Sequence, residues 1–165
     1  MSTSTHNIGG PWSLVIRRYE PLDHSAVVDL HHLGLNQDGA NAGPGPWDDD
    51  LDEITRHYIE SGGEFLVGVV DGQLVAMGAI RPVDSQRGEL KRMRVHPRYQ
   101  GRGFGQLILT YLEDRARVLG FTNLVLDTTI RQLKAQALYL KNGYIETHRS
   151  LQNDQDLIFL RKDLT

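Results

Sequence analysis

The chain has 165 residues, of which 39% are hydrophobic and 24% charged, and a single domain of this length buries about two-thirds of the surface that its unfolded chain exposes. It contains no cysteine, which excludes disulfides, thiolate zinc sites and a cysteine nucleophile, and it has no apolar run of about 18 residues that would form a membrane helix. The net charge of −3 does not favour nucleic acid as a partner. We therefore expect one cytoplasmic domain over residues 1–165 that binds neither membranes nor nucleic acid.

The first half of the chain predicts a strand, two helical segments and a long loop. Residues 1–13 are polar and predict a frayed tail. Residues Leu14–Tyr19 predict the first strand, and Asp23 is expected to cap a helix whose apolar residues recur at helical spacing as far as Leu35. Residues 36–47 are rich in glycine and proline, which predicts a loop. A second helix is expected over Asp48–Ile59, with acidic residues in its first turn opposing the helix dipole.

The second half predicts alternating strands and helices. Asp71 and Gly72 separate two alternating apolar runs, which is a strong hairpin signal. The apolar run Leu124–Leu126 is typical of a strand buried on both faces. The predicted strands are Phe65–Val70, Gln73–Ile80, Glu89–Val95, Leu124–Leu126, Tyr144–Ser150 and Leu157–Arg161, and the predicted helices are Gly105–Leu119 and Gln132–Lys141. This order indicates one mixed α/β domain.

A glycine-rich turn connects a predicted strand to a predicted helix over residues 95–105. Its glycines allow positive φ and a close approach of the backbone to an anion, and the following helix adds partial positive charge. Residues 81–102 contain seven basic and two acidic side chains, so the turn suits a pyrophosphate. The spacing is neither that of a P-loop nor that of a dinucleotide fingerprint. A glycine-rich turn without a ligand is the structural alternative.

The turn resembles the signature of the GNAT superfamily of acetyl-CoA-dependent N-acetyltransferases, which is Gln/Arg-x-x-Gly-x-Gly/Ala after a strand that ends in Val-x-Pro. Val95, Pro97, Gln100, Gly103 and Gly105 match this signature in register. Further matches follow at Ala135, Leu138, Tyr139, Gly143 and Tyr144. The resemblance implies a central, mostly antiparallel sheet of about seven strands with four helices. It also implies that the fourth and fifth strands, residues 89–95 and 124–127, splay apart.

The resemblance also implies an acetyl-CoA site without a metal. The residues that it places at the cofactor are Met93, Arg94, Val95, Gln100, Gly101, Arg102, Gly103, Phe104, Gly105 and Gln132. Gln132 stands where many members have Asn. Tyr139 would be the general acid for the CoA sulfur, and Glu89 would be the general base. The structural alternative for Tyr139 is a packed aromatic ring. For Glu89 it is an exposed carboxylate that balances Lys91 and Arg92.

Several other polar residues admit two interpretations. His31 and His32 lack the i,i+4 spacing of helical metal ligands, so we expect structural roles. Residues 127–129 end a buried strand, where they either contact the acceptor or cap the next helix, and the cap is favoured. Trp47 and the acidic residues that follow it could select a cationic amine, or they could simply begin a helix.

The predicted reaction is transfer of an acetyl group from acetyl-CoA to a primary amine by direct attack in a ternary complex. A small-molecule acceptor is favoured. The alternatives are a protein lysine or N-terminal acetyltransferase and a non-catalytic acyl-CoA sensor. Homodimers are frequent in the family, so a homodimer is an option by analogy.

Overall fold

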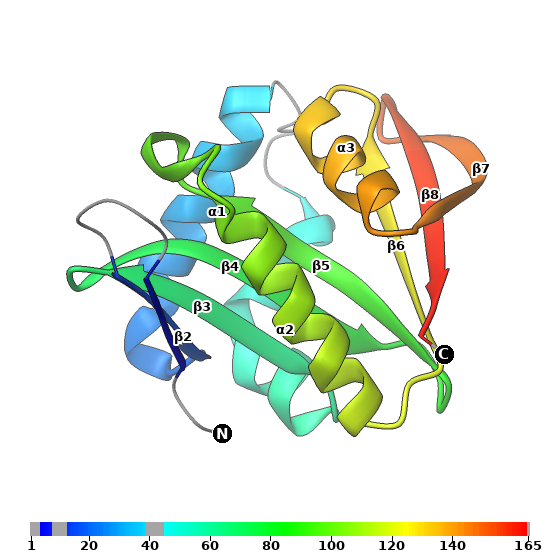
Figure 1. Ribbon diagram of the computed structural model, residues 1–165. Helices are drawn as coiled ribbons and strands as arrows, with labels where there is room; N and C mark the ends of the chain where they lie inside the picture. The colour runs from blue at the N-terminus through cyan, green and yellow to red at the C-terminus, as the bar shows by residue number, and fades with distance from the viewer. Residues whose placement is uncertain (1–3, 8–12, 39–44, 165) are drawn as a thin grey trace.

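The computed structural model describes residues 4–7, 13–38 and 45–164. They form one eight-stranded sheet in the order β1-β2-β3-β4-β5-β6-β8-β7 (Figure 1). All neighbouring strands pair antiparallel except β5 and β6, which are parallel. The strands are β1 (Ser4–Asn7), β2 (Ser13–Arg18), β3 (Glu64–Val70), β4 (Gln73–Pro82), β5 (Arg87–Val95), β6 (Asn123–Thr129), β7 (Ile145–Gln152) and β8 (Gln155–Asp163).

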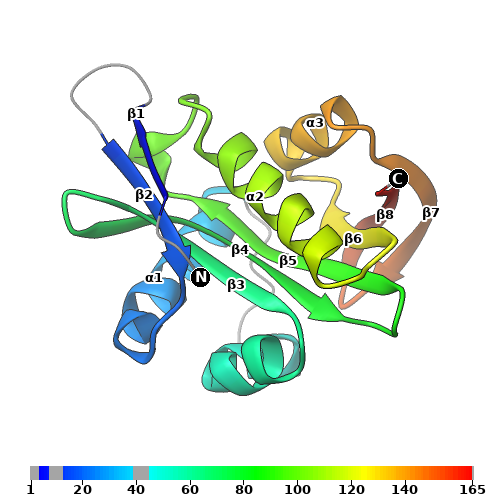
Figure 2. The same cartoon turned by 60° about the horizontal axis from the view of Figure 1, so that its bottom comes forward.

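Helices cover both faces of the sheet. The helical segments are η1 (Pro21–Asp23), α1 (His24–Asp38), η2 (Pro46–Glu53), η3 (Thr55–Glu60), η4 (Pro97–Tyr99), α2 (Phe104–Val118) and α3 (Leu133–Lys141). Figure 2 shows α2 and α3 on one face, with α1 and η3 on the opposite face. Two clusters of buried apolar side chains correspond to these two layers. No helix within the described residues combines the length and hydropathy needed to cross a bilayer.

Strands β5 and β6 part from each other in the middle of the sheet. Their parallel register covers three pairs, the last of which is Glu89 with Val125. Beyond it β5 carries a bulge, at which Arg92 has a φ of 59° and the register with β4 shifts. The predicted mixed sheet with splayed fourth and fifth strands is therefore confirmed. Strand β1 is an addition to the predicted set.

The N-terminal part of the fold differs from the prediction in three places. The predicted tail includes β1, which pairs antiparallel with β2; backbone hydrogen bonds form this edge pairing, so it does not require apolar residues. Helix α1 continues to Asp38, into the predicted loop, of which residues 39–44 lie outside the described residues. The segment predicted as a helix from residue 48 to 59 is a 3₁₀-helix, η2, followed by a π-helix, η3.

Strand β6 also differs from the prediction, because it is covered on one face. Leu124 and Leu126 are buried under the α2 layer, whereas Val125 is half-buried and Asp127 is exposed on the other face. Val125 lines a cavity on this face, so no helix covers it there. The prediction of burial on both faces was therefore wrong, and the open face contributes to the site described next.

Candidate active site between two cavities

The glycine-rich turn has the backbone conformation that its sequence predicts. Gly101 and Gly103 have positive φ values of 75° and 84°, and Gly103 is the N-cap of α2. A cavity of about 310 Å³, here called the loop cavity, lies beside this turn. Its lining includes the predicted residues Met93, Arg94, Val95, Gln100, Gly101, Gly103, Phe104, Gly105 and Gln132. Arg102 was also predicted, but it is exposed and lies outside this lining.

The side chain of Gln100 ties the turn to three elements. Its amide donates to the backbone oxygen of Val95 at 3.1 Å and to Gln37 of α1 at 2.9 Å. Its oxygen accepts from the Lys134 ammonium of α3 at 2.8 Å. Because the side-chain amide is engaged with protein, an anion in the loop cavity would be left to the backbone N–H groups and the basic side chains of the lining.

Tyr139 lies on α3 at the junction of two cavities. Its side chain is 5% exposed, and its ring packs edge-on against Tyr144 with centroids 5.5 Å apart. Burial raises the pKa of its hydroxyl; the charge of Arg94 acts in the opposite direction, and Asp127 reinforces the rise. The hydroxyl has no hydrogen-bond partner among the described residues. Tyr139 therefore offers a neutral O–H donor to a ligand.

A second cavity of about 380 Å³, here called the strand cavity, opens where β5 and β6 part. Residues from α1, η2, β4, β5, β6, α3 and the β7–β8 hairpin line it. The residues that it shares with the loop cavity are Met93, Arg94, Gln132, Ala135 and Tyr139. Two ligands, one bound in each cavity, would thus meet beside the Tyr139 hydroxyl.

Glu89, predicted as the base, lines the strand cavity and is ion-paired. Arg81 donates to its carboxylate at 2.9 Å. Asp127, one strand away, lines the same cavity and has no hydrogen-bond or ion-pair partner among the described residues. Although the side chain of Asp127 is exposed to solvent, the cavity walls remove part of its hydration and raise its pKa, and the negative charge of Glu89 raises it further. An unpaired carboxylate with a raised pKa suits Asp127 to accept a proton from a ligand in this cavity.

The bulge residue Arg92 anchors η2 to the sheet. Its guanidinium is buried and donates to the Asp50 carboxylate, to Asp48 at 3.1 Å and to the backbone oxygen of Trp47 at 2.7 Å. Burial opposes ionisation of Asp50, but hydrogen bonds from Arg92 and Tyr58 outweigh it and lower its pKa to about 2. The sequence left these acidic residues as either a helix start or groups that select a cationic amine, and the structure shows that they also fix Trp47 on the wall of the strand cavity.

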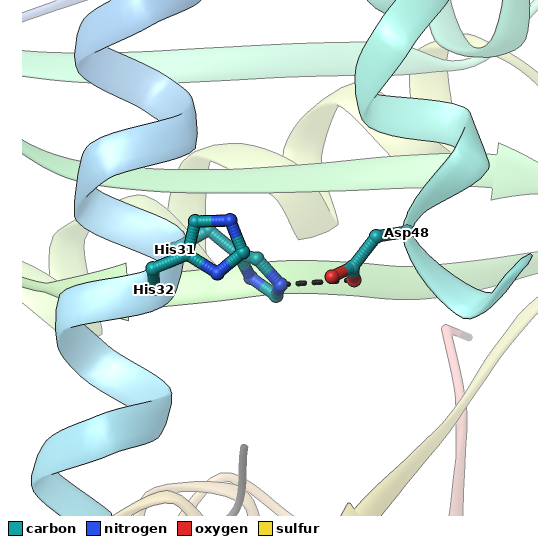
Figure 3. A group of neighbouring side chains, drawn as sticks. All are labelled: His31, His32 and Asp48. Carbon is teal, nitrogen blue, oxygen red and sulfur yellow. Dashed lines mark hydrogen bonds and ion pairs between the residues drawn. The ribbon is translucent and has the colours of Figure 1, made fainter. Parts of the chain in front are cut away.

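His31, His32 and Asp48 bring three ligand atoms within 4.8 Å of one another (Figure 3). His31 Nε2 lies 3.0 Å from Asp48 Oδ1, and the guanidinium of Arg92 lies 3.4 Å from the same nitrogen. Burial, with the charges of Arg94 and Arg92, lowers the pKa of His31 to about 4. A cation held here would face the fixed charge of Arg92, so the group is better described as a hydrogen-bonded network around a neutral histidine.

Several side chains of the site depart from their sequence-based interpretation. The favoured interpretation that residues 127–129 cap the next helix is wrong, since the N-cap of α3 is Gln132 and it has no side-chain cap hydrogen bond. The carboxylate of Asp127 makes no hydrogen bond to α3 among the described residues. Gln132 instead accepts hydrogen bonds from the Thr128 hydroxyl and the Thr129 N–H, both at 3.1 Å. The polar end of an otherwise apolar strand was the sequence signal for Asp127. Lys91 and Arg92 were treated as generic cations because a bulge cannot be read from residue types.

The family model and the related proteins that match this chain are all described as acetyltransferases. Residues 33–144 match the family model described as acetyltransferase (GNAT) family. The chain is 39% identical to an IAA acetyltransferase of Azospirillum brasilense over 99 residues, which cover 59% of the chain and 61% of that protein, less than two thirds of its length. It is 29% identical over 143 residues to the aminoglycoside N(6')-acetyltransferase type 1 of Stenotrophomonas maltophilia, covering 81% and 88% of the two chains.

The fold has solved counterparts as well. The structure of yncA from Salmonella typhimurium with its cofactor acetyl-CoA superposes with a TM-score of 0.76 at 21% identity, covering 92% of this chain and 94% of that one. At this identity the likeness shows the fold alone.

Proposed function

Because the chain belongs to the acetyltransferase (GNAT) family, we propose that it transfers the acetyl group of acetyl-CoA to the primary amine of a small molecule, by direct attack in a ternary complex. The observation that carries this proposal is the meeting of the loop cavity and the strand cavity at Tyr139. A donor in one cavity and an acceptor in the other would place the reacting groups next to a protonated hydroxyl.

The loop cavity fits acetyl-CoA, the expected cosubstrate, in its residue types. A Cβ atom built on Gly101 or Gly103 meets nothing within 4 Å, so the backbone of the turn is open to a phosphate. Lys134 and Lys141 supply positive charge in the lining, and α2 begins at the turn. Bound acetyl-CoA would supply an activated thioester carbonyl. The residues proposed to hold it are Met93, Arg94, Val95, Gly101, Gly103, Phe104 and Gly105, with Gln100 and Gln132 as supports.

The protein must move two protons in this reaction. An amine with a pKa of about 10.4 is unprotonated in roughly one molecule in two thousand at pH 7, so a base is required. We assign the first proton to the unpaired carboxylate of Asp127, and Glu89 is the alternative base predicted from the family. As the carbon–nitrogen bond forms and the carbon–sulfur bond breaks, Tyr139 donates its proton to the sulfur. The second amine proton then passes to the tyrosinate and restores Tyr139, and Asp127 releases the first proton to solvent.

A small-molecule acceptor is supported by size and by relatives. The strand cavity has a volume of about 380 Å³, which suits a compact ligand. The names of two relatives, an IAA acetyltransferase and an aminoglycoside acetyltransferase, describe enzymes for small molecules. The absence of cysteine from the sequence is compatible with the cytoplasm as the proposed compartment. The exposed edge strand β7 offers a surface for the proposed homodimer.

The function is tested by binding and turnover together. At acetyl-CoA about 100-fold above Kd we expect roughly 2.7 kcal/mol of stabilisation, or a rise in Tm on the order of 5 to 10 °C. Release of the CoA thiol is then followed with a panel of small amines and with lysine peptides. Faster turnover of a peptide than of every small amine would contradict the small-molecule acceptor. Absence of a thermal shift at millimolar acetyl-CoA would contradict the assigned cosubstrate.

A matched pair of variants separates loss of the site from loss of the fold. Gly103→Glu introduces negative charge at a positive-φ residue of the turn and should abolish the thermal shift. Gly62→Glu introduces the same side chain at another positive-φ glycine, with a φ of 94° and open space around its Cβ, away from either cavity. The Gly62 variant should keep the shift. Equal loss in both variants would show that backbone strain, rather than the phosphate site, is responsible.

A further inference from the structure

We propose, on the basis of the proposed function, that the acceptor carries an acidic group in addition to its amine, so that Lys91 binds the acidic group while Asp127 faces the amine. The acceptor class is therefore an amino acid or a closely similar amino acid analogue, rather than a polyamine or an aminosugar.

Lys91 and Asp127 stand on opposite sides of the gap between β5 and β6. The last backbone pair of these strands joins Glu89 to Val125. Each strand then runs two residues further to a charged side chain on the open face, Lys91 on β5 and Asp127 on β6. Both side chains line the strand cavity. A ligand entering the gap would meet a cation on one wall and an anion on the other.

The lining holds other charged groups, including Arg94, which donates to the backbone oxygen of Met93 at 2.7 Å. Glu89 is paired with Arg81 at 2.9 Å, and Arg92 is paired with Asp48 at 3.1 Å. Neither Lys91 nor Asp127 has a hydrogen-bond or ion-pair partner anywhere in the part of the chain that the structure describes. Lys91 and Asp127 thus present one positive and one negative group for a ligand to satisfy.

The electrostatic environment of both groups favours a ligand with both charges. Burial lowers the pKa of the Lys91 ammonium, so its charge has lost hydration that an acidic group of the ligand would replace. Partial loss of hydration in the cavity likewise raises the pKa of Asp127, and an ammonium group of the ligand would counteract that rise. A diamine would satisfy Asp127 but would bring a second cation toward Lys91 and Arg92. An acceptor with one charge of each sign avoids that repulsion.

An adjoining cavity accommodates the rest of such an acceptor. It has a volume of about 330 Å³ and shares Arg81, Glu89 and Asp127 with the strand cavity. Apolar side chains complete much of its wall, including Val83, Val125 and Phe159. The ring of Phe159 is stacked on that of His148, with centroids 4.2 Å apart and 10° between planes. We therefore expect acceptors with apolar side chains to be preferred over those with charged ones.

The test compares acceptors that differ in the acidic group alone. Phenylalanine, phenylalaninamide and phenethylamine share the amine and the apolar side chain, and the corresponding alanine and leucine sets vary its size. We expect kcat/KM to be at least tenfold higher for the acids than for their amides or decarboxylated amines. Intrinsic reactivity alone would favour the amides over the acids, because the amines of the amides are less basic and a larger fraction of them is unprotonated. Amides or simple amines that are acetylated as well as the acids would overturn the proposal.

Variants then test whether Lys91 recognises the acidic group of the acceptor. Lys91→Met should lower the ratio of kcat/KM for acid over amide at least tenfold, and Lys91→Gln should do the same if the Met variant does not fold. Arg56→Met is the control, because it removes one positive charge from an exposed side chain outside the cavities. An unchanged acid-to-amide ratio in a folded Lys91 variant would overturn the assignment.

The panel also distinguishes failure of this inference from failure of the proposed function. Turnover of putrescine or an aminoglycoside but not of the acids would overturn the amino acid class and leave acetyl transfer to an amine intact. If acetyl-CoA shifts Tm but no amine is acetylated, the transfer function and this inference are both overturned.

Discussion

At the scale of single residues, Tyr139 is kept neutral by its surroundings. Burial raises the pKa of its hydroxyl, and the hydroxyl has no partner among the described residues. Tyr139→Phe retains the ring that packs against Tyr144 and removes the proton donor. We expect kcat to fall by about 10², the low end for general acid catalysis, because a thiolate is already a tolerable leaving group.

The measurement for Tyr139 needs turnover and calorimetry on the same preparation. Acetyl-CoA affinity should be nearly unchanged, since the ring still lines the loop cavity. A Phe variant with more than about a third of the parental kcat, where chemistry limits the rate, would assign Tyr139 a packing role only.

The two carboxylates on the open face can be separated by their pH dependence. Asp127 is unpaired with a raised pKa, whereas Glu89 is held by Arg81. We expect Asp127→Asn to lower kcat/KM by about 10² near neutral pH and less at alkaline pH, where the amine arrives unprotonated. Glu89→Gln should have the smaller effect. A larger loss of kcat/KM in the Glu89 variant than in the Asp127 variant would return the role of base to Glu89. Losses of kcat/KM that do not change with pH in either variant would exclude both residues as the base.

At the scale of elements, the bulge in β5 and the 3₁₀-helix η2 depend on each other. Arg92 is buried against Asp48, Asp50 and the backbone of Trp47. Arg92→Met would leave the buried carboxylate of Asp50 without its cation, and removal of one partner of a buried pair costs about 3–5 kcal/mol. Urea denaturation measures this loss. The exposed ion pair of Arg56 with Glu53 provides the comparison, because Arg56→Met should change the unfolding free energy by less than about 1 kcal/mol.

The sequence predicted the order of the elements well because their signals are local. The hairpin at Asp71–Gly72 has positive φ at both residues, as that dipeptide predicts, and α2 follows the glycine turn. The glycine turn was predicted for the same reason, whereas the role of Tyr139 was implied by the resemblance to the GNAT family. The bulge at Arg92 and the single covered face of β6 depend on strand neighbours far away in the chain, which residue types alone do not specify.

At the scale of the whole molecule, the buried histidine couples folding to pH. The pKa of His31 is lowered to about 4 by burial and by Arg94 and Arg92, despite the opposing influence of Asp48. Between about pH 6.5, its ordinary pKa, and pH 4, this histidine is protonated in the unfolded chain but neutral in the native state. The free energy of unfolding should therefore fall as pH decreases from about 6.5 toward 4, by up to about 3 kcal/mol.

Urea denaturation of the wild type and of His31→Gln across this pH range isolates the effect. The wild type should lose up to about 1.4 kcal/mol per pH unit more than the variant, the equivalent of one proton. Asp50 contributes at lower pH, since its pKa of about 2 lies below that of an unfolded aspartate. Parallel pH profiles for the two proteins would contradict a neutral buried His31.

The separation of the two cavities also has an evolutionary consequence. They share five lining residues, whereas the walls that distinguish acceptors, such as Trp47, Lys91 and Asp127, belong to the strand cavity. Substitutions there would alter which amine is accepted while the glycine turn keeps its ligand. A lineage could thus change its substrate in small mutational steps without an intermediate that has lost cofactor binding. Directed evolution of this scaffold should accordingly yield altered acceptor preference most readily from libraries confined to β5, β6 and η2.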